Sequence, residues 1–152
     1  MRHIFIFALF FSLAGSAAIQ DIVLVSEGVN TKLIIKADAP FVANTFTLKD
    51  PARIVVDCSG ISSSLIGKKY DVDRGGVKAL TVTGFTAQAD LVRIVGEMSS
   101  DYSFLTLVQE NNFVVTLLTG LTSSFPEWQA STAPQLLSER CESFATQRPL
   151  NR

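Results

Sequence analysis

The residues best suited to bind a ligand lie in residues 53–58, a run rich in β-branched side chains that follows a proline turn. A turn followed by such a run predicts a hairpin and its second strand. Side chains alternate along a strand, so Arg53 and Asp57 share one face while Ile54 and Val56 share the other. An arginine on an outer face can bind a carboxylate. The alternative is that Arg53 and Asp57 form a surface ion pair, worth under about 1 kcal/mol.

Further cations extend this potential binding surface. In the run 91–98, Arg93 is expected on the face opposite to Ile94. The most charged segment of the chain, residues 68–76, is predicted to be a basic, aromatic loop. Its candidate binding residues are Lys68, Lys69, Tyr70 and Arg74. For each of them the alternative is a solvated surface side chain that binds no ligand.

The types of residue present argue against catalysis. The single histidine is His3, so the rest of the chain has no imidazole to bind zinc, act as a base or activate a thiol. Neither a Gly-x-Ser-x-Gly nucleophile motif nor a phosphate-binding glycine-rich loop occurs. Asp71 and Asp73 are interpreted as solvated carboxylates. We therefore predict a protein that is not an enzyme, with no catalytic residue, no metal site and no cofactor.

The N-terminus has the pattern of a secretory signal peptide. A basic region at residues 1–3 is followed by the apolar run 4–13 and by small residues up to Ala18. This pattern predicts a signal peptide over residues 1–18, cut after Ala17 or Ala18. No other run approaches the roughly 20 apolar residues of a spanning helix, so no membrane span is expected after cleavage.

Export would place Cys58 and Cys141 in an oxidising compartment, where the pair can form a disulfide. Cys58 falls on the apolar side of its strand, which fits a buried free thiol equally well. Both interpretations stay open.

The charge of the exported chain is weakly acidic. Removal of Arg2 leaves 13 − 1 = 12 basic residues against 14 acidic ones, a net charge of 12 − 14 = −2. We therefore expect no binding to nucleic acid.

The hydrophobic pattern predicts an all-β domain over residues 19–120. Apolar runs alternate with turn residues, and no helical periodicity lasts for three turns before Pro134. Shifted by 60 residues, the chain repeats the order strand, break, strand, tight turn, strand and glycine. We expect a β-sandwich of two similar small antiparallel sheets, one apolar face from each half, although any two β meanders could match at this level. Strands are predicted at 22–26, 31–37, 46–49, 53–58, 77–85, 91–98, 102–109 and 113–119.

The composition changes to Ser, Thr, Gln and Pro after the last predicted strand. We interpret residues 121–152 as a linker that contains Trp128, a short C-terminal helix and a flexible tail. The helix is predicted to begin at Pro134 and to end near Ala145.

Two stretches resemble the signature of the AMIN domain. The first is Phe46-Thr-Leu-Lys-Asp-Pro-Ala-Arg-Ile-Val-Val-Asp, and the second is Gly84-Phe85 followed by residues 92–98. The resemblance covers about residues 21–120 and implies a periplasmic module of two packed sheets. Such modules stand in front of the catalytic domain of N-acetylmuramoyl-L-alanine amidases and in front of type IV pilus secretins. The chain departs from the family pattern at Thr83, where an arginine is common, and at Gly96-Glu97-Met98.

The resemblance also implies a function, which is to bind peptidoglycan without catalysis. Arginines would bind the peptide carboxylates, and exposed aromatic rings would stack on the sugars. The alternative is a protein-interaction module in an envelope assembly such as a pilus or secretion machinery, acting through exposed strand edges. A domain kept only as a structural remnant is a third interpretation. The candidate peptidoglycan-binding residues are Arg53, Asp57, Arg93, Lys68, Lys69, Tyr70 and Arg74.

Overall fold

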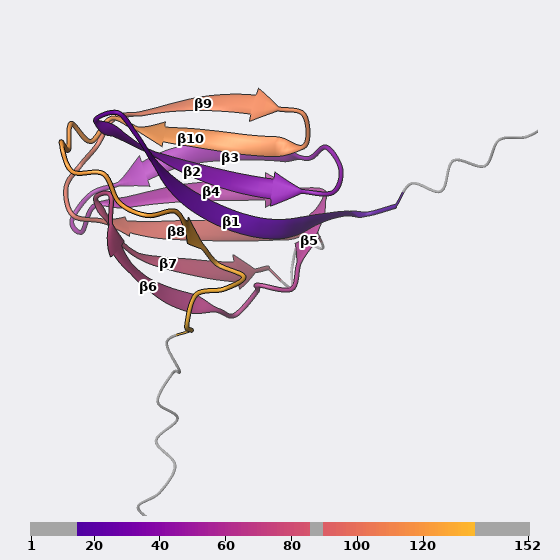
Figure 1. Ribbon diagram of the computed structural model, residues 1–152. Coiled ribbons are helices and arrows are strands. Elements are labelled where there is room, and N and C mark those ends of the chain that lie inside the picture. Colours follow the sequence, from indigo (N-terminus) through magenta and orange to yellow (C-terminus); the bar gives the residue numbers. More distant parts are fainter. Residues whose placement is uncertain (1–14, 86–89, 136–152) are drawn as a thin grey trace, which may run out of the picture.

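The computed structural model describes residues 15–85 and 90–135. In these ranges every regular element is a β-strand, and no helix is present that could cross a membrane. The strands form two sheets packed face to face around one core (Figure 1). The all-β sandwich predicted from the alternation of apolar runs is therefore confirmed.

The first sheet, called sheet A, has six strands, and its main path follows the order β11-β1-β2-β10-β9. Neighbours on this path are antiparallel, whereas β5 pairs in parallel with the start of β1. The strands are β1 (Ala17–Glu27), β2 (Asn30–Ala37), β5 (Ile61–Ser63), β9 (Phe104–Gln109), β10 (Asn112–Leu117) and β11 (Trp128–Gln129).

The second sheet, called sheet B, has five antiparallel strands in the order β3-β4-β8-β7-β6. Its β3–β4 hairpin is the one predicted from the proline turn, with Asp50 at φ 54° and Pro51 between the strands. Pro51 lacks an N–H, and at this corner no ladder bond is lost. The strands are β3 (Val42–Leu48), β4 (Arg53–Ser59), β6 (Lys69–Arg74), β7 (Val77–Gly84) and β8 (Leu91–Met98).

The two sheets follow the 60-residue repeat, but each takes strands from both halves of the chain. Hairpin β1–β2 of sheet A corresponds to β7–β8 of sheet B, and β3–β4 of sheet B corresponds to β9–β10 of sheet A. The order β1-β2-β10-β9 thus matches the order β7-β8-β4-β3. The two similar sheets were predicted, whereas this exchange of hairpins between the halves was not.

The core is formed by the inward-facing side chains of both sheets. On β4 the predicted apolar face is confirmed, because Ile54, Val56 and Cys58 are at most 1% exposed. Val55 is also buried although it faces outward, since Phe46 and Val95 lie beside it on the neighbouring strands. Further fully buried side chains are Ile22, Leu24, Leu33, Ile35, Leu80, Ile94 and Leu117.

The segment predicted as a basic, aromatic loop is the edge strand β6. Tyr70 and Val72 point into the core, while Lys69, Asp71 and Asp73 are exposed, so the segment alternates as a strand does. The charged outward residues masked this alternation in the sequence. A turn at Gly75 then leads into β7, and a Cβ at Gly75 would collide with the ring of Phe125.

Residues 125–135, called here the C-terminal strap, lie against the sandwich, which differs from the predicted linker. The indole of Trp128 is buried, and the β11 segment that carries it pairs with β1. The ring of Trp128 meets Tyr70 edge-on at 5.5 Å between centroids, so the strap joins β1 of sheet A to β6 of sheet B. Burial of the large aromatic side chain of Trp128 stabilises the folded state.

Polar bonds fix the part of the C-terminal strap that follows Trp128. The Oγ and the backbone N–H of Ser131 donate to the Asp21 carboxylate at 2.7 and 3.0 Å, and Gln135 forms a bridge with Tyr70. The predicted C-terminal helix falls mainly on residues 136–145, which lie outside the described residues.

The first strand begins inside the predicted signal peptide. Ala17 is buried and pairs with Ile61, and the backbone N–H of Ala18 donates to Asp38 at 2.7 Å. A cut after either alanine would remove part of this pairing. Residues 1–14 lie outside the described residues, so the signal peptide stays a prediction.

Candidate functional site

The outer face of sheet B is the surface on which the sequence placed Arg53, Asp57 and Arg93. The register of its strands arranges the outward side chains in three rows across the sheet. The middle row is largely apolar, and a row with charged residues lies on each side of it. The rows are Leu48, Arg53, Glu97, Ala79 and Asp71; Phe46, Val55, Val95, Thr81 and Lys69; and Asn44, Asp57, Arg93 and Thr83.

Arg93 and Asp57 form a bidentate ion pair across strands β8 and β4. Arg93 donates from Nε to Asp57 Oδ1 at 2.6 Å and from Nη2 to Oδ2 at 2.8 Å. The arginine side chain is 34% exposed and the aspartate 19%. The hydrogen bond to Asp57 raises the pKa of Arg93, which therefore stays charged. Two parallel bonds fix the plane of the guanidinium, so the group is held in one orientation.

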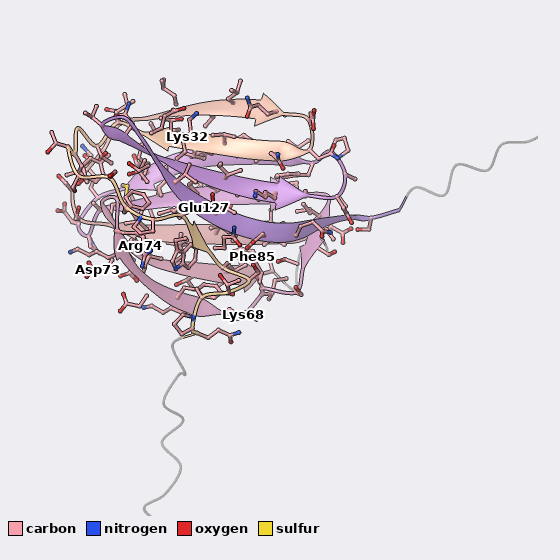
Figure 2. The ribbon with its side chains drawn as sticks, viewed as in Figure 1. Lys32, Lys68, Asp73, Arg74, Phe85 and Glu127 are labelled. Atoms are coloured by element: carbon pink, nitrogen blue, oxygen red, sulfur yellow. The ribbon has the colours of Figure 1, made fainter. Side chains whose placement is uncertain are left out.

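Two phenylalanine rings lie against this guanidinium. The Arg93 Cζ is 4.9 Å from the ring centroid of Phe85 and 5.8 Å from that of Phe46, both within the range of cation–π attraction. Phe85 is 40% exposed and is labelled in Figure 2. These residues, Phe46, Asp57, Phe85 and Arg93, are called here the Arg93 cluster. They form a fixed surface that combines a positive charge with exposed aromatic carbon.

Arg53 does not pair with Asp57, contrary to the alternative drawn from the sequence. Four residues along a strand span about 13 Å, whereas directly opposed residues on adjacent strands lie about 5 Å apart. Asp57 therefore bonds to Arg93, which stands opposite it. Within the described residues Arg53 takes part in no ion pair, and its Nε is buried without a hydrogen-bond partner.

The four candidates from residues 68–74 do not form one surface. Lys69 on β6 pairs with Glu97 at 3.4 Å, and Arg74 at the far end of the strand donates from Nε to the Val72 carbonyl at 3.1 Å. Figure 2 shows Lys68 and Arg74 well apart along β6. Tyr70 is fully buried, so the prediction that it offers its ring to a ligand is wrong. Burial, followed by the charge of Asp21, raises the pKa of the Tyr70 hydroxyl.

Comparison with protein families matches this chain to the AMIN domain over residues 21–117. The chain belongs to the AMIN domain family. These domains are non-catalytic periplasmic modules associated with peptidoglycan binding and localisation. Comparison with curated proteins gives no match. The matched residues contain both stretches that resemble the family signature and all of the Arg93 cluster.

Sequence reasoning missed the two aromatic members of the cluster in this AMIN domain. The sequence predicts both residues to lie at strand positions within the two family-like stretches and assigns neither to ligand binding. Phe46 approaches Arg93 across the strands of sheet B, and Phe85 directly follows β7, where its N–H donates to the Leu91 carbonyl. Alternation within one strand reveals neither approach. The sequence offers a signal for Phe46 alone, because it is an outward residue of the predicted hairpin, whose first strand lies two strands away from Arg93.

The cysteine of the central hairpin lies in the core of the domain. Burial, with a smaller effect of the Asp57 charge, raises the pKa of the Cys58 thiol to about 12. Cys141 lies outside the described residues, so the disulfide between them stays a prediction. Within residues 15–85 and 90–135, no three His, Cys, Asp or Glu side chains come together as a metal site would require.

Proposed function

We propose that this AMIN domain binds peptidoglycan, without catalysis, through the outer face of sheet B. The observation that carries the proposal is the Arg93 guanidinium, held by Asp57 against the partly exposed ring of Phe85. A sugar ring can pack its C–H face on such an aromatic surface. No bond from the third guanidinium nitrogen, Nη1, to another described residue is present, so this atom can donate to an acetyl or peptide carbonyl.

Arg53 is proposed to bind the carboxylates of the stem peptides. Among the arginines at positions 53, 74 and 93, Arg93 is neutralised by Asp57 and Arg74 donates to backbone carbonyls. Among these three, Arg53 is the one whose side chain forms neither an ion pair nor a hydrogen bond with a described residue. It lies two rows away from the Arg93 row, about 13 Å from Asp57 along β4. That spacing allows one face to contact a glycan and a stem peptide at once.

Export through a signal peptide over residues 1–18 is part of the proposal, because it would bring the domain to the compartment of its family. The second candidate function is a protein-interaction module in an envelope assembly, such as a pilus or secretion machinery. The uncovered edge of sheet A at β9 favours it, since an unpaired edge can accept a strand from another protein.

The proposal is tested by co-sedimentation of the secreted protein with purified peptidoglycan sacculi at moderate salt. Phe85→Ala and Arg53→Ala are each expected to weaken binding about tenfold, a loss of about 1.4 kcal/mol. Lys36→Ala removes a positive charge from the outward side of β2 in sheet A and is expected to bind as the native protein does. Arg93→Ala is less informative, because it would leave the partly buried Asp57 carboxylate unpaired.

Thermal unfolding of each variant separates a local effect from loss of the fold. Peptidoglycan binding through this face would be contradicted if Phe85→Ala and Arg53→Ala pellet as well as Lys36→Ala. An assembly partner would instead co-purify with the protein after the sacculi have been removed.

A further inference from the structure

Strand β9 is an open edge with an unusual surface. It ends the path of sheet A, with no strand beyond it in the described residues. Leu105, Leu107 and Val108 are 61%, 55% and 64% exposed. The strand Phe104–Gln109 has no charged residue, no proline and no irregularity in its register with β10.

Both faces of β9 are exposed because the strand extends past sheet B. Leu105 and Leu107 point outward, whereas Thr106 and Val108 point to the inner side, opposite the buried Val115 and Phe113 of β10. The β3 end of sheet B meets β10, because Phe41, directly before β3, contacts Phe113 of β10 at 6.5 Å between ring centroids. Figure 1 shows β9 at the margin of the molecule, beyond β3.

Among the other ends of the sheets, β6 and β11 carry the protection that β9 lacks, whereas β3 is uncharged and alternates apolar residues with Asn44, Thr45 and Thr47. The edge strand β6 has outward charges and an irregular register between Asp71 and Arg74, and β11 has only two residues. Charges, bulges and short length are the usual means of preventing strand addition at an edge. An uncharged apolar edge of six residues is therefore suited to pairing.

We propose that β9 is a dimerisation edge, at which two copies of this chain pair in antiparallel orientation about a two-fold axis at Thr106. A two-fold axis through the joined sheet requires that opposed residues point to the same face, which restricts the axis to a residue position. With the axis at Thr106, Leu105 stands opposite Leu107 of the second copy, and Phe104 stands opposite Val108. Within residues 104–108 every opposed pair is then apolar, except the two threonines, which can bond to each other, and Gln109 stands opposite Ser103.

Neighbouring registers match less well. An axis at Leu107 would place Leu105 opposite Gln109 and Thr106 opposite Val108. An axis at Leu105 would place Leu107 opposite Ser103. Each pairs an exposed apolar residue with a polar one, so the Thr106 register buries the most apolar surface.

The pairing buries a limited area. Pairing of one six-residue strand from each copy buries a total surface on the order of 1,000 Å², which is the lower limit for a specific interface. The dimer is therefore expected to form reversibly in the micromolar range.

The geometry also has a consequence for binding, which rests on the proposed function. The two-fold axis is perpendicular to the joined sheet, so sheet B of both copies lies on the same side of it. Two peptidoglycan-binding faces would then meet one polymeric ligand together and increase its apparent affinity.

The first test is sedimentation equilibrium of the secreted protein over a range of concentrations, without peptidoglycan. Thr106→Lys places two ammonium groups opposite each other and is expected to weaken the dimer at least about tenfold. Thr122→Lys adds the same charge at an exposed loop position and is expected to dimerise as the native protein does. A protein that stays monomeric at millimolar concentration, or a dimer unaffected by Thr106→Lys, overturns the proposal.

The second test determines the register. In a Cys141→Ser background, Thr106→Cys places two thiols directly opposite each other, and oxidation is expected to join the copies covalently. Leu105→Cys is the matched control, because in this register the two thiols are offset by two residues along the strand. Crosslinking at Leu105 but not at Thr106 overturns the register. Neither experiment uses sacculi, so failure of peptidoglycan binding does not affect the outcome.

Discussion

The two long sides of the sandwich are built in opposite ways. On the closed side, β6 and β1 are bridged by the C-terminal strap, whose Trp128 is buried against Tyr70. On the open side, β9 has no neighbour in the described part of the chain and exposes leucine and valine on both faces. The 60-residue repeat makes β9 the counterpart of β3, so both open-side strands are edges.

In this fold, one side provides contacts that stabilise the monomer and the other provides an edge that can associate with another chain. The closed side uses contacts between residues far apart in the sequence: Asp21 with Ser131 fixes the strap to sheet A, and Trp128 with Tyr70 joins it to sheet B. The open side leaves backbone donors and acceptors free, and these contribute to stability only when another strand pairs with them. Substitutions on the closed side should therefore cause large losses of unfolding free energy, whereas substitutions on the open side should mainly change association between chains.

The largest effect is expected from Trp128→Ala, which removes the main contact of the closed side. Loss of a buried indole of this size costs about 3–5 kcal/mol of unfolding free energy. Urea denaturation followed by circular dichroism measures the change. Leu118→Ala is the control, because Leu118 is 41% exposed and its loss should change little. A loss below about 1 kcal/mol for Trp128→Ala would mean that the strap does not stabilise the fold.

A second effect concerns the core behind the open side, where Cys58 on β4 pairs with Ala43 on β3. Burial raises the pKa of this thiol from 9.0 to about 12. Between these pH values the unfolded chain releases the proton and the folded chain does not. The contribution of the protonated Cys58 thiol to stability should thus be fully present below pH 9. Above pH 9 the unfolding free energy should fall by up to about 1.4 kcal/mol per pH unit.

Cys58→Ala isolates this contribution, because the variant has no thiol to titrate. Its unfolding free energy should decline less steeply than that of the native protein from pH 9 to pH 12. Tyr70, whose pKa is also raised, contributes in the same direction to both proteins. Equal slopes would show that the thiol is hydrated and that the open side admits water to the core.

Alternation along single strands predicted much of this fold. The apolar face of β4, the hairpin at Pro51 and the pair of similar sheets all follow from spacings of two residues and from the 60-residue repeat. Alternation was also present in residues 69–74 but was concealed, because all of its outward positions are charged. The density of charge there predicts a loop, and in a loop Tyr70 would lie at the surface.

The binding face depended on information that lies between strands. The sequence identified Arg53, Asp57 and Arg93, but the partner of Asp57 is decided by the register of β4 with β8. The position of Trp128 likewise depends on a contact with Tyr70, 58 residues earlier in the chain (128 − 70). Neither local propensity nor composition reports such long-range contacts, so polar residues around Trp128 predicted a linker.

A smaller effect is expected from Tyr70→Phe on the closed side. The Tyr70 hydroxyl is buried, and it has no hydrogen-bond partner among the described residues. Removing it should leave stability unchanged or raise it by about 1 kcal/mol, because an unsatisfied buried group is lost. Tyr102→Phe is the control and should be slightly destabilising, since that hydroxyl bonds to Ser99 Oγ at 2.9 Å. Thermal unfolding compares the two, and a clear loss for Tyr70→Phe would identify a bond to the hydroxyl.

The smallest effect is expected on the open side, from Leu107→Ala in β9. Leu107 is 55% exposed, so its truncation should change the unfolding free energy by only about 0.5 kcal/mol. Leu117→Ala on the adjacent strand is the matched control, because Leu117 is fully buried and its truncation should cost about 2–5 kcal/mol. Urea denaturation at low protein concentration keeps the chain monomeric, and at high concentration it includes any pairing of β9. A loss for Leu107→Ala that grows with protein concentration would place this leucine in an interface, whereas a large loss at low concentration would mean that β9 is packed within the monomer and that the open side is not open.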